Sequence, residues 1–438
     1  MTPEMLGIVM VGVMVIFILL GGHVAATLGA TGIIFALIAG RLDLISLFPD
    51  RFYTIMTSFS LEAVPLFVFM GTVLERAGIA ERVYNALYLV MGRLPGSLLL
   101  ATTVFSIIFG ACTGILGAIT VTMGLIALPA MLKARYSKEL ACGTICAGGS
   151  LGLVIPPSIM LILYGPSAGV SIAELFFACL IPGVGLGILY LIYIGIRCYL
   201  NPKLGPPIPL EERRKITGRA KFRLVLTSIL PTFALIIAVL GSILFGIASP
   251  TEAAAVGGVG ALVIAAFYRK LTWKNLKDAC WSTTKITALI MFIVIGAGVF
   301  TTVFMGLGSS DLVINFILGL HAGTLGTISL ILGIIFILGM FMDWISILLV
   351  FVPLSIPIVK SLGIDPLWFG TLFCLVLTIS CITPPFAYTT FYLKGIAPPE
   401  VTLADIYRGV LPYIPIQVLI VVLVYKFPIL CTWLPSLM

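Results

Sequence analysis

One carboxylate stands out because it lies within sequence that is otherwise apolar. Asp343 occurs in the stretch FILGMFMDWISILLVF, far from any polar segment. A carboxylate at the centre of a membrane costs roughly 2.5–3.5 kcal/mol on insertion scales, so it needs a partner or a bound ion. Two compatible roles follow: a Na⁺ ligand, and an N-cap that accepts the backbone N–H of Ile345 or Ser346.

The helix-breaking sequence around Asp343 has a counterpart in the first half of the chain. The stretch GACTGILGAITVTMGL is followed by LVIPPSIM, and GMFMDWISILLVF is followed by ISCITPPFAY. Pro156 and Pro157 match Pro384 and Pro385 at one offset. Broken helix at membrane depth is tolerated only where protein buries it or where it lines a cavity, and a pair of breaks in corresponding halves is typical of a transporter's binding site.

These breaks predict two mirrored sodium sites, because Na⁺ prefers oxygen ligands and unwound helix supplies carbonyls and hydroxyls. The first predicted site comprises Cys112, Thr113, Gly114, Val154, Ile155 and Ser158. The second comprises Asp343, Ser346, Ser380, Ile382 and Thr383. Helix N-termini at the same breaks carry the positive ends of helix dipoles and are able to hold a substrate carboxylate. The alternative for each Pro pair is a kink whose freed carbonyls are satisfied by Ser or Thr.

Other polar patterns fit structural roles. Ser249, Pro250 and Glu252 form the pattern of a capping box with Pro at the first helical position. Nine cysteines lie in apolar segments without a CxxC pair or a metal-ligand spacing. The sequence contains no G-x-x-x-x-G-K-[ST] loop, so we expect no direct use of ATP. No zinc-ligand spacing or pair of aspartates supports an intramembrane enzyme.

The elements that position these residues must be membrane helices. The 438-residue chain is 61% hydrophobic and 10% charged, with a mean hydropathy of +1.22, whereas soluble domains have roughly a quarter charged residues. Many apolar runs reach the ~20 residues that span a bilayer. The sequence therefore predicts an all-α polytopic membrane protein whose first helix is retained, since the N-terminus lacks the features of a cleaved signal peptide. Lys and Arg beside helices explain the net charge of +8 without nucleic-acid binding.

The two halves of the chain share one plan. Residues recur at a single offset: Gly78 and Gly308, Asn85 and Asn315, Gly165 and Gly395, Pro182 and Pro412. A constant register over most of the chain indicates an internal duplication. We predict a first repeat over residues 1–200, a basic cytoplasmic linker over 201–223 and a second repeat over 224–438.

Each repeat is predicted to contain a re-entrant helical hairpin followed by a Pro-broken helix. The hairpins cover about 97–134 and 325–360, and the broken helices cover about 139–164 and 366–396.

Charge sets the relative orientation of the repeats. With a cytoplasmic linker and re-entrant hairpins, every Lys and Arg faces the cytoplasm except Arg41, Arg51, Lys360 and Lys426. This distribution obeys the positive-inside rule. It predicts inverted repeats, an N-terminus outside the cytoplasm, a first hairpin that opens inward and a second that opens outward.

Three stretches resemble the large membrane subunit of tripartite ATP-independent periplasmic (TRAP) transporters, and the likeness covers essentially the whole chain. They are IPPSIMLILYGPSAGVSIAELFFACLIPG, SPTEAAAVGGVGAL and GIDPLWFGTLFCLVLTISCITPPFAYTTFYLKGIA. The resemblance implies a Na⁺-coupled, elevator-type importer of the bacterial inner membrane, with a scaffold around a mobile domain of hairpins and broken helices. It also implies two partners. A small four-helix membrane subunit would accompany a periplasmic substrate-binding protein that delivers a C4-dicarboxylate, a sialic acid or another sugar acid.

The same resemblance assigns tips and breaks to residues of this chain. The first tip is 111–118, the first Pro break 153–158, the second tip 342–346 and the second break 380–385. The family often has a Ser-Gly-Ser first tip, whereas this chain reads Cys-Thr-Gly-Ile at 112–115, which shifts ligation towards carbonyls. Two other functions compete: a stand-alone Na⁺-coupled organic-anion carrier or exchanger that needs no binding protein, and a membrane scaffold or receptor that transports nothing.

Overall fold

The computed structural model describes the whole chain except residues 1, 93, 208–217 and 320–322, and within this part all regular elements are helical. Residues 208–217 of the predicted linker therefore lie outside the described residues. The first half contains α1 (Pro3–Leu19), α2 (Val24–Ile38), α3 (Leu42–Ser46), α4 (Phe48–Met56), α5 (Ala63–Arg76), α6 (Ile79–Met91), α7 (Ser97–Thr113), α8 (Leu116–Lys133), α9 (Lys138–Val154), α10 (Ile159–Ala168) and α11 (Ile172–Leu200). The second half contains α13 (Gly218–Leu244), α14 (Pro250–Phe267), α15 (Trp273–Gly306), α16 (Ser309–Gly319), α17 (Gly323–Gly339), α18 (Trp344–Ser361), α19 (Pro366–Ser380), α20 (Tyr388–Ile396), α21 (Leu403–Val410), α22 (Tyr413–Lys426) and α23 (Ile429–Thr432).

Several of these helices suit a membrane. Among the described residues, eight helical segments are long and apolar enough to cross one, or nine if α3, α4 and α5 are counted together as one span bent by 52°. Side-chain capping fixes the start of α14. The predicted capping box of α14 is confirmed, because Ser249 Oγ accepts the Glu252 N–H at 3.3 Å and the Glu252 carboxylate accepts the Ser249 N–H at 2.7 Å.

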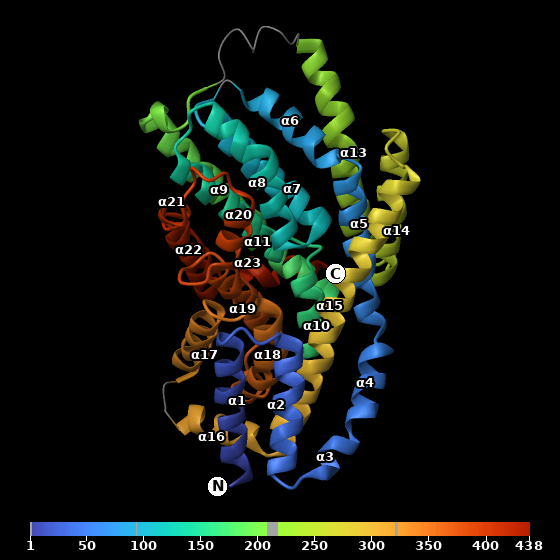
Figure 1. Ribbon diagram of the computed structural model, residues 1–438, viewed down its shortest axis with the longest axis vertical. Coiled ribbons are helices and arrows are strands. Elements are labelled where there is room, and N and C mark those ends of the chain that lie inside the picture. The colour runs from blue at the N-terminus through green and yellow to red at the C-terminus, as the bar shows by residue number, and fades with distance from the viewer. Residues whose placement is uncertain (1, 93, 208–217, 320–322) are drawn as a thin grey trace.

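The second half repeats the order of the first half in the inverted sense. A helical hairpin (α7–α8, α17–α18) is followed in each half by a helix that is interrupted at a Pro pair (α9–α10, α19–α20). Figure 1 shows the two hairpins in opposite halves of the long axis, with α1 at the lower end and α13 at the upper end. The all-α membrane fold with two inverted repeats is thus the one that the sequence predicted.

The repeats interlock through reciprocal helix contacts. α8 of the first hairpin packs on α20, and α18 of the second hairpin packs on α10. The same reciprocity holds for the long helices, because α2 packs along α15 while α14 packs along α5. Each hairpin therefore rests on the broken helix of the other half, and the two halves form one structure.

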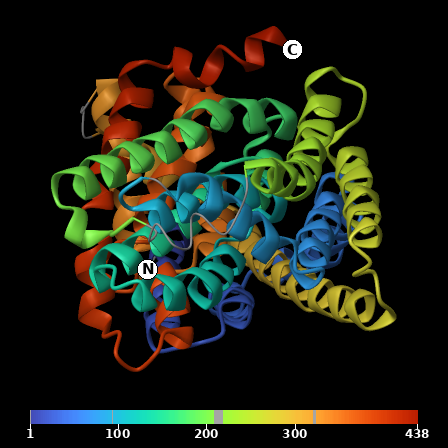
Figure 2. The same ribbon diagram turned by 90° about the horizontal axis from the view of Figure 1, so that it is seen from above.

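The helices of the whole molecule also form two groups, each with members from both halves. In the first group, α5, α13 and α14 stand to one side when the molecule is seen from above (Figure 2), and α15 packs on both α2 and α5. The hairpins and the broken helices make up the second group. The crossing of α2 and α15 depends on a missing side chain, since a Cβ at Gly296 would lie 2.4 Å from the Ala25 carbonyl oxygen. Small residues allow such close backbone approach between membrane helices.

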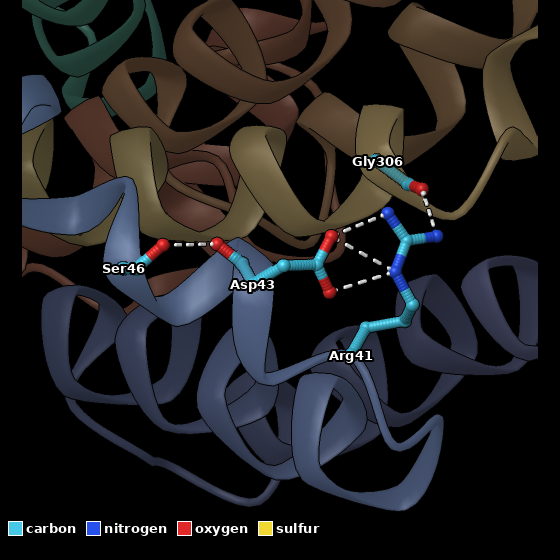
Figure 3. Close-up of polar contacts among 4 residues, drawn as sticks. All are labelled: Arg41, Asp43, Ser46 and Gly306. Carbon is cyan, nitrogen blue, oxygen red and sulfur yellow. Dashed lines mark hydrogen bonds and ion pairs between the residues drawn. The ribbon is translucent and has the colours of Figure 1, made fainter.

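An exposed set of polar contacts, made by Arg41, joins the end of α2 to the end of α15 (Figure 3). Arg41 Nη2 donates to the Asp43 carboxylate at 2.7 Å, and Arg41 Nη1 donates to the Gly306 carbonyl at 3.2 Å. Gly306 is the last residue of α15, where backbone carbonyls lack helical partners, so the guanidinium caps this end. Solvent screens the ion pair, and its contribution to stability is small.

Packing at the α2–α15 crossing is therefore expected to contribute more to the free energy of unfolding than the contacts of Arg41 with Asp43 and Gly306. Gly296→Val should destabilise the protein by about 1–3 kcal/mol because its side chain would overlap the Ala25 carbonyl, and Arg41→Gln should have little effect. Gly333→Val on α17 is the matched control, because a Cβ there meets open space. Thermal unfolding of the purified variants measures the difference. Equal melting temperatures for Gly296→Val and Gly333→Val would show that the crossing does not limit stability.

Candidate functional site

The first hairpin reverses at Gly114. α7 ends at Thr113 and α8 begins at Leu116, so only two residues form the turn. Gly114 has a left-handed φ of +59°, and a Cβ there would lie 2.8 Å from the carbonyl oxygen of Pro157. Backbone conformation and close contact both require glycine, and the tip packs directly on the first Pro break.

The second hairpin reverses between α17 and α18, where Asp343 lies. The Asp343 carboxylate accepts the backbone N–H of Ile345 at 3.0 Å, which confirms its predicted role as an N-cap. The side chain is only partly buried, and it lines a cavity. A carboxylate that caps a helix and also reaches open space retains lone pairs for a ligand.

The second tip is also tied to its own Pro break. The Phe386 N–H donates to the Met340 carbonyl at 3.3 Å. A Cβ at Gly339 would lie 2.5 Å from the Ser380 Oγ, so α17 and α19 approach closely at this point. In each half, the structure thus brings the predicted tip and the predicted break together. The Pro156–Pro157 and Pro384–Pro385 peptide bonds are both cis.

Most of the predicted hydroxyl ligands already satisfy backbone carbonyls. Ser158 Oγ donates to the Leu153 carbonyl at 2.5 Å, and Thr383 Oγ1 donates to the Ile379 carbonyl at 2.7 Å. Thr113 and Ser380 donate to the carbonyl four residues earlier. These bonds match the alternative role of Ser and Thr at a kink. They leave the hydroxyl lone pairs available, because a hydroxyl that donates one bond still accepts others.

Ser346 differs from these hydroxyls. Its side chain is fully buried, and its Oγ has no hydrogen-bond partner among the described residues. An unpaired buried hydroxyl costs about 1–3 kcal/mol. It lies in the first turn of α18, three residues after Asp343. Among the described residues, Ser346 is thus the predicted ligand whose hydroxyl has no partner.

The remaining predicted ligands offer backbone carbonyls. Val154 is the last residue of α9, and Ile155 follows it at the break. Ile382 follows α19, where its N–H donates to the Ile379 carbonyl at 3.1 Å. Cys112 is fully buried near the end of α7.

Both tips open onto one cavity of about 420 Å³. Ile115 and Gly117 of the first tip line it together with Asp343 and Trp344 of the second tip. The start of α2 and the middle of α15 form the opposite wall, through His23 and Ile290 among others. Apolar walls with a few convergent polar groups are typical of a small-molecule site.

Two tyrosines in this cavity were not predicted from the sequence. Tyr388 and Tyr392 of α20 both line it, and the Tyr392 ring lies against Gly117, where a Cβ would be 3.2 Å from its Cζ. Their spacing of four residues places them on one helix face. This spacing is the sequence pattern from which a shared role of the two tyrosines was predictable. Among the described residues, no cluster of three His, Cys, Asp or Glu side chains is able to hold a metal ion.

Comparison with known proteins gives consistent matches. A family model described as "Tripartite ATP-independent periplasmic transporter, DctM component" matches residues 11–430. The C4-dicarboxylate TRAP transporter large permease protein DctM of Vibrio cholerae is 29% identical over 100% of this chain and 98% of its own length. The ectoine/5-hydroxyectoine TRAP transporter large permease protein UehC of Ruegeria pomeroyi is 33% identical over 86% of each chain. The crystal structure of the Alcanivorax borkumensis YdaH transporter, described as having an unusual topology, has the same fold, with a TM-score of 0.62 and 17% identity over 98% of this chain and 99% of that chain.

The unpaired Ser346 hydroxyl gives a direct test of the second site. Without Na⁺, Ser346→Ala should leave the melting temperature unchanged or raise it, because it removes an unsatisfied buried group. With Na⁺, the same variant should lose the increase in melting temperature that the wild-type protein gains from the ion.

The matched control is Ser355→Ala on the same helix. The Ser355 hydroxyl is buried and donates to the Phe351 carbonyl at 2.7 Å, so its loss should lower stability equally in both salts. Thermal unfolding in NaCl and in choline chloride compares the two variants. A normal Na⁺ effect in Ser346→Ala would exclude Ser346 from the ion site.

Proposed function

The chain belongs to the DctM family of tripartite ATP-independent periplasmic transporters, and from this premise we propose that it imports an organic acid by means of a Na⁺ gradient. It is a multi-pass membrane protein and a large permease subunit, not an enzyme. One observation carries the proposal. Both hairpin tips line a single cavity, where the Asp343 carboxylate caps α18 and the unpaired, buried Ser346 hydroxyl lies behind it in the first turn of that helix.

Na⁺ is the proposed coupling ion. The second site supplies a carboxylate and hydroxyls, and the first supplies carbonyls and the hydroxyls of Thr113 and Ser158 at the Gly114 turn. Such oxygens at helix breaks hold Na⁺ in secondary transporters. Each excess charge carried inward by the membrane potential releases roughly 2.3 kcal/mol per 100 mV, which is enough to drive accumulation of an anion.

An elevator motion is the proposed mechanism. α2, α5, α14 and α15 pack on one another, and the hairpins and broken helices form the second group. The shared cavity lies between the groups, with α15 and the start of α2 on one side and the tips on the other. Movement of the second group along α15 would carry the ion and substrate between the two faces of the membrane.

The proposed partners follow from the family. A small four-helix membrane subunit would bind beside this chain in the bilayer of the bacterial inner membrane, with the N-terminus of this chain in the periplasm. A periplasmic binding protein would deliver the substrate. The relatives named above act on C4-dicarboxylates and on ectoines, and the proposed substrate of this chain is a C4-dicarboxylate, a sialic acid or another sugar acid.

The test is uptake into proteoliposomes that contain this chain and its small subunit, with an inward Na⁺ gradient. Asp343→Asn should keep the helix cap, since Asn also caps well, yet should lower uptake about tenfold or more at fixed Na⁺, because an interaction with a charged group contributes about 1.5–3 kcal/mol. Asp365→Asn is the matched control, because Asp365 caps α19 through the Leu367 N–H at 2.9 Å in the same geometry but outside the cavity lining.

Each result has one meaning. Uptake that needs Na⁺ and the external binding protein supports the tripartite importer. Na⁺-driven uptake without the binding protein would make the chain a stand-alone organic-anion carrier. Uptake that is indifferent to Na⁺, or equal losses in Asp343→Asn and Asp365→Asn, would contradict the ion site at the second tip.

A further inference from the structure

A second cavity of about 550 Å³ lies between α4, α10, α15 and α18. Hydroxyls of Thr54, Ser167 and Thr301 contribute to its lining. Among the described residues that line it, the charged ones are two cations, Arg51 of α4 and Lys360 of α18.

This cavity follows the same three helices as the cavity at the hairpin tips. α10, α15 and α18 line both, and on each helix the two linings lie within about one turn of each other. Buried apolar side chains separate them. These are Ile159, Ile293 and Ile345 on the side of the tips, and Leu163, Val294 and Leu349 on the side of the second cavity. The two cavities are therefore neighbouring chambers along α10, α15 and α18.

The two cations have no ion-pair partner among the described residues. The ion pairs found among the described residues are Arg41 with Asp43 and Arg408 with Glu139. The stem of Arg51 lies against α15, where a Cβ at Gly298 would be 3.4 Å from its Cγ. Arg51 and Lys360 are both exposed, and two uncompensated cations that line one chamber produce a positive potential that attracts anions.

The position of these cations in the topology strengthens the argument. Lys and Arg are disfavoured outside the cytoplasm, and in the predicted topology only four residues of these types lie there, Arg51 and Lys360 among them. Two of the four line this one cavity. Selection against outer cations makes their convergence on one chamber a sign of function.

We propose that this chamber is an outer vestibule that binds a carboxylate of the organic acid before the acid reaches the hairpin tips. The identity of the anion rests on the proposed function, whereas the attraction of anions rests on Arg51 and Lys360 alone. A phosphate headgroup of an anionic lipid presents the same chemistry, so the test must separate the two sources.

The experiment measures the potential of the vestibule without transport. Cys280, the exposed cysteine, is changed to Ser, and the exposed Thr54 in the vestibule is changed to Cys. The chain with its small subunit is placed in phosphatidylcholine vesicles. The external thiol is then labelled with an anionic, sulfonate-bearing methanethiosulfonate and, separately, with its quaternary ammonium analogue. The ratio of the two rates reports the local potential.

The rate ratio should favour the anionic reagent and should fall about tenfold when Arg51→Gln and Lys360→Gln are combined. Arg51→Lys with Lys360→Arg should preserve it. Lys426→Gln should not alter it, because Lys426 is exposed and predicted to be outside but lines neither chamber. Succinate, as a probe dicarboxylate, should slow the anionic reagent in neutral vesicles.

Two results would overturn the proposal. A ratio unchanged by the double Gln variant would show that the chamber has no anion-attracting potential. A ratio lowered by phosphatidylglycerol but unaffected by succinate would assign the cations to lipid headgroups. Failure of the proposed function would instead appear as Na⁺-independent uptake, which this labelling does not measure.

Discussion

A helix that breaks within a membrane leaves backbone groups that neither water nor lipid is able to satisfy. In the second half of this protein, neighbouring segments satisfy such backbone groups. The Phe386 N–H bonds to the Met340 carbonyl, and the Thr389 N–H and hydroxyl both bond to the Cys381 carbonyl at 3.2 Å. In the first half, the tip and the break are in close contact at Gly114 and Pro157. Most of the predicted ligand hydroxyls are also the groups that satisfy backbone carbonyls.

The sequence was sufficient to predict the features that local physics determines. The isolated carboxylate at Asp343 predicted a cap, the Pro pairs predicted the breaks, and glycine and charge patterns predicted inverted repeats. The predicted residue bounds of these features were less accurate than their existence and order. The predicted first tip, 111–118, is shorter in the structure, where helix continues to Thr113 and resumes at Leu116, because the left-handed Gly114 reverses the chain within two residues. The local sequence around the tip does not by itself determine the number of residues in the turn.

Tertiary contacts explain what sequence reasoning missed. Tyr388, Tyr392 and His23 reach the cavity only because α20 packs on α8 of the other half and because α2 packs along α15. The unpaired state of Ser346 is likewise visible only when its surroundings are known. The role of α15 as a common wall of two chambers depends on helices far apart in the chain, and periodicity does not encode such neighbours.

These observations combine into one proposed account, in which the hairpin tips move along α15 from one chamber to the other. Disulfide cross-linking in membranes tests it most directly, with Ile345→Cys paired with Ile290→Cys or with Thr301→Cys in a Cys280→Ser background. Ile345 and Ile290 line the cavity at the tips, while Thr301 lines the second chamber. The account predicts that both pairs form and that each blocks uptake. Formation of the first pair alone, with uptake preserved, would contradict it, because the tips would then function without leaving the inner part of α15.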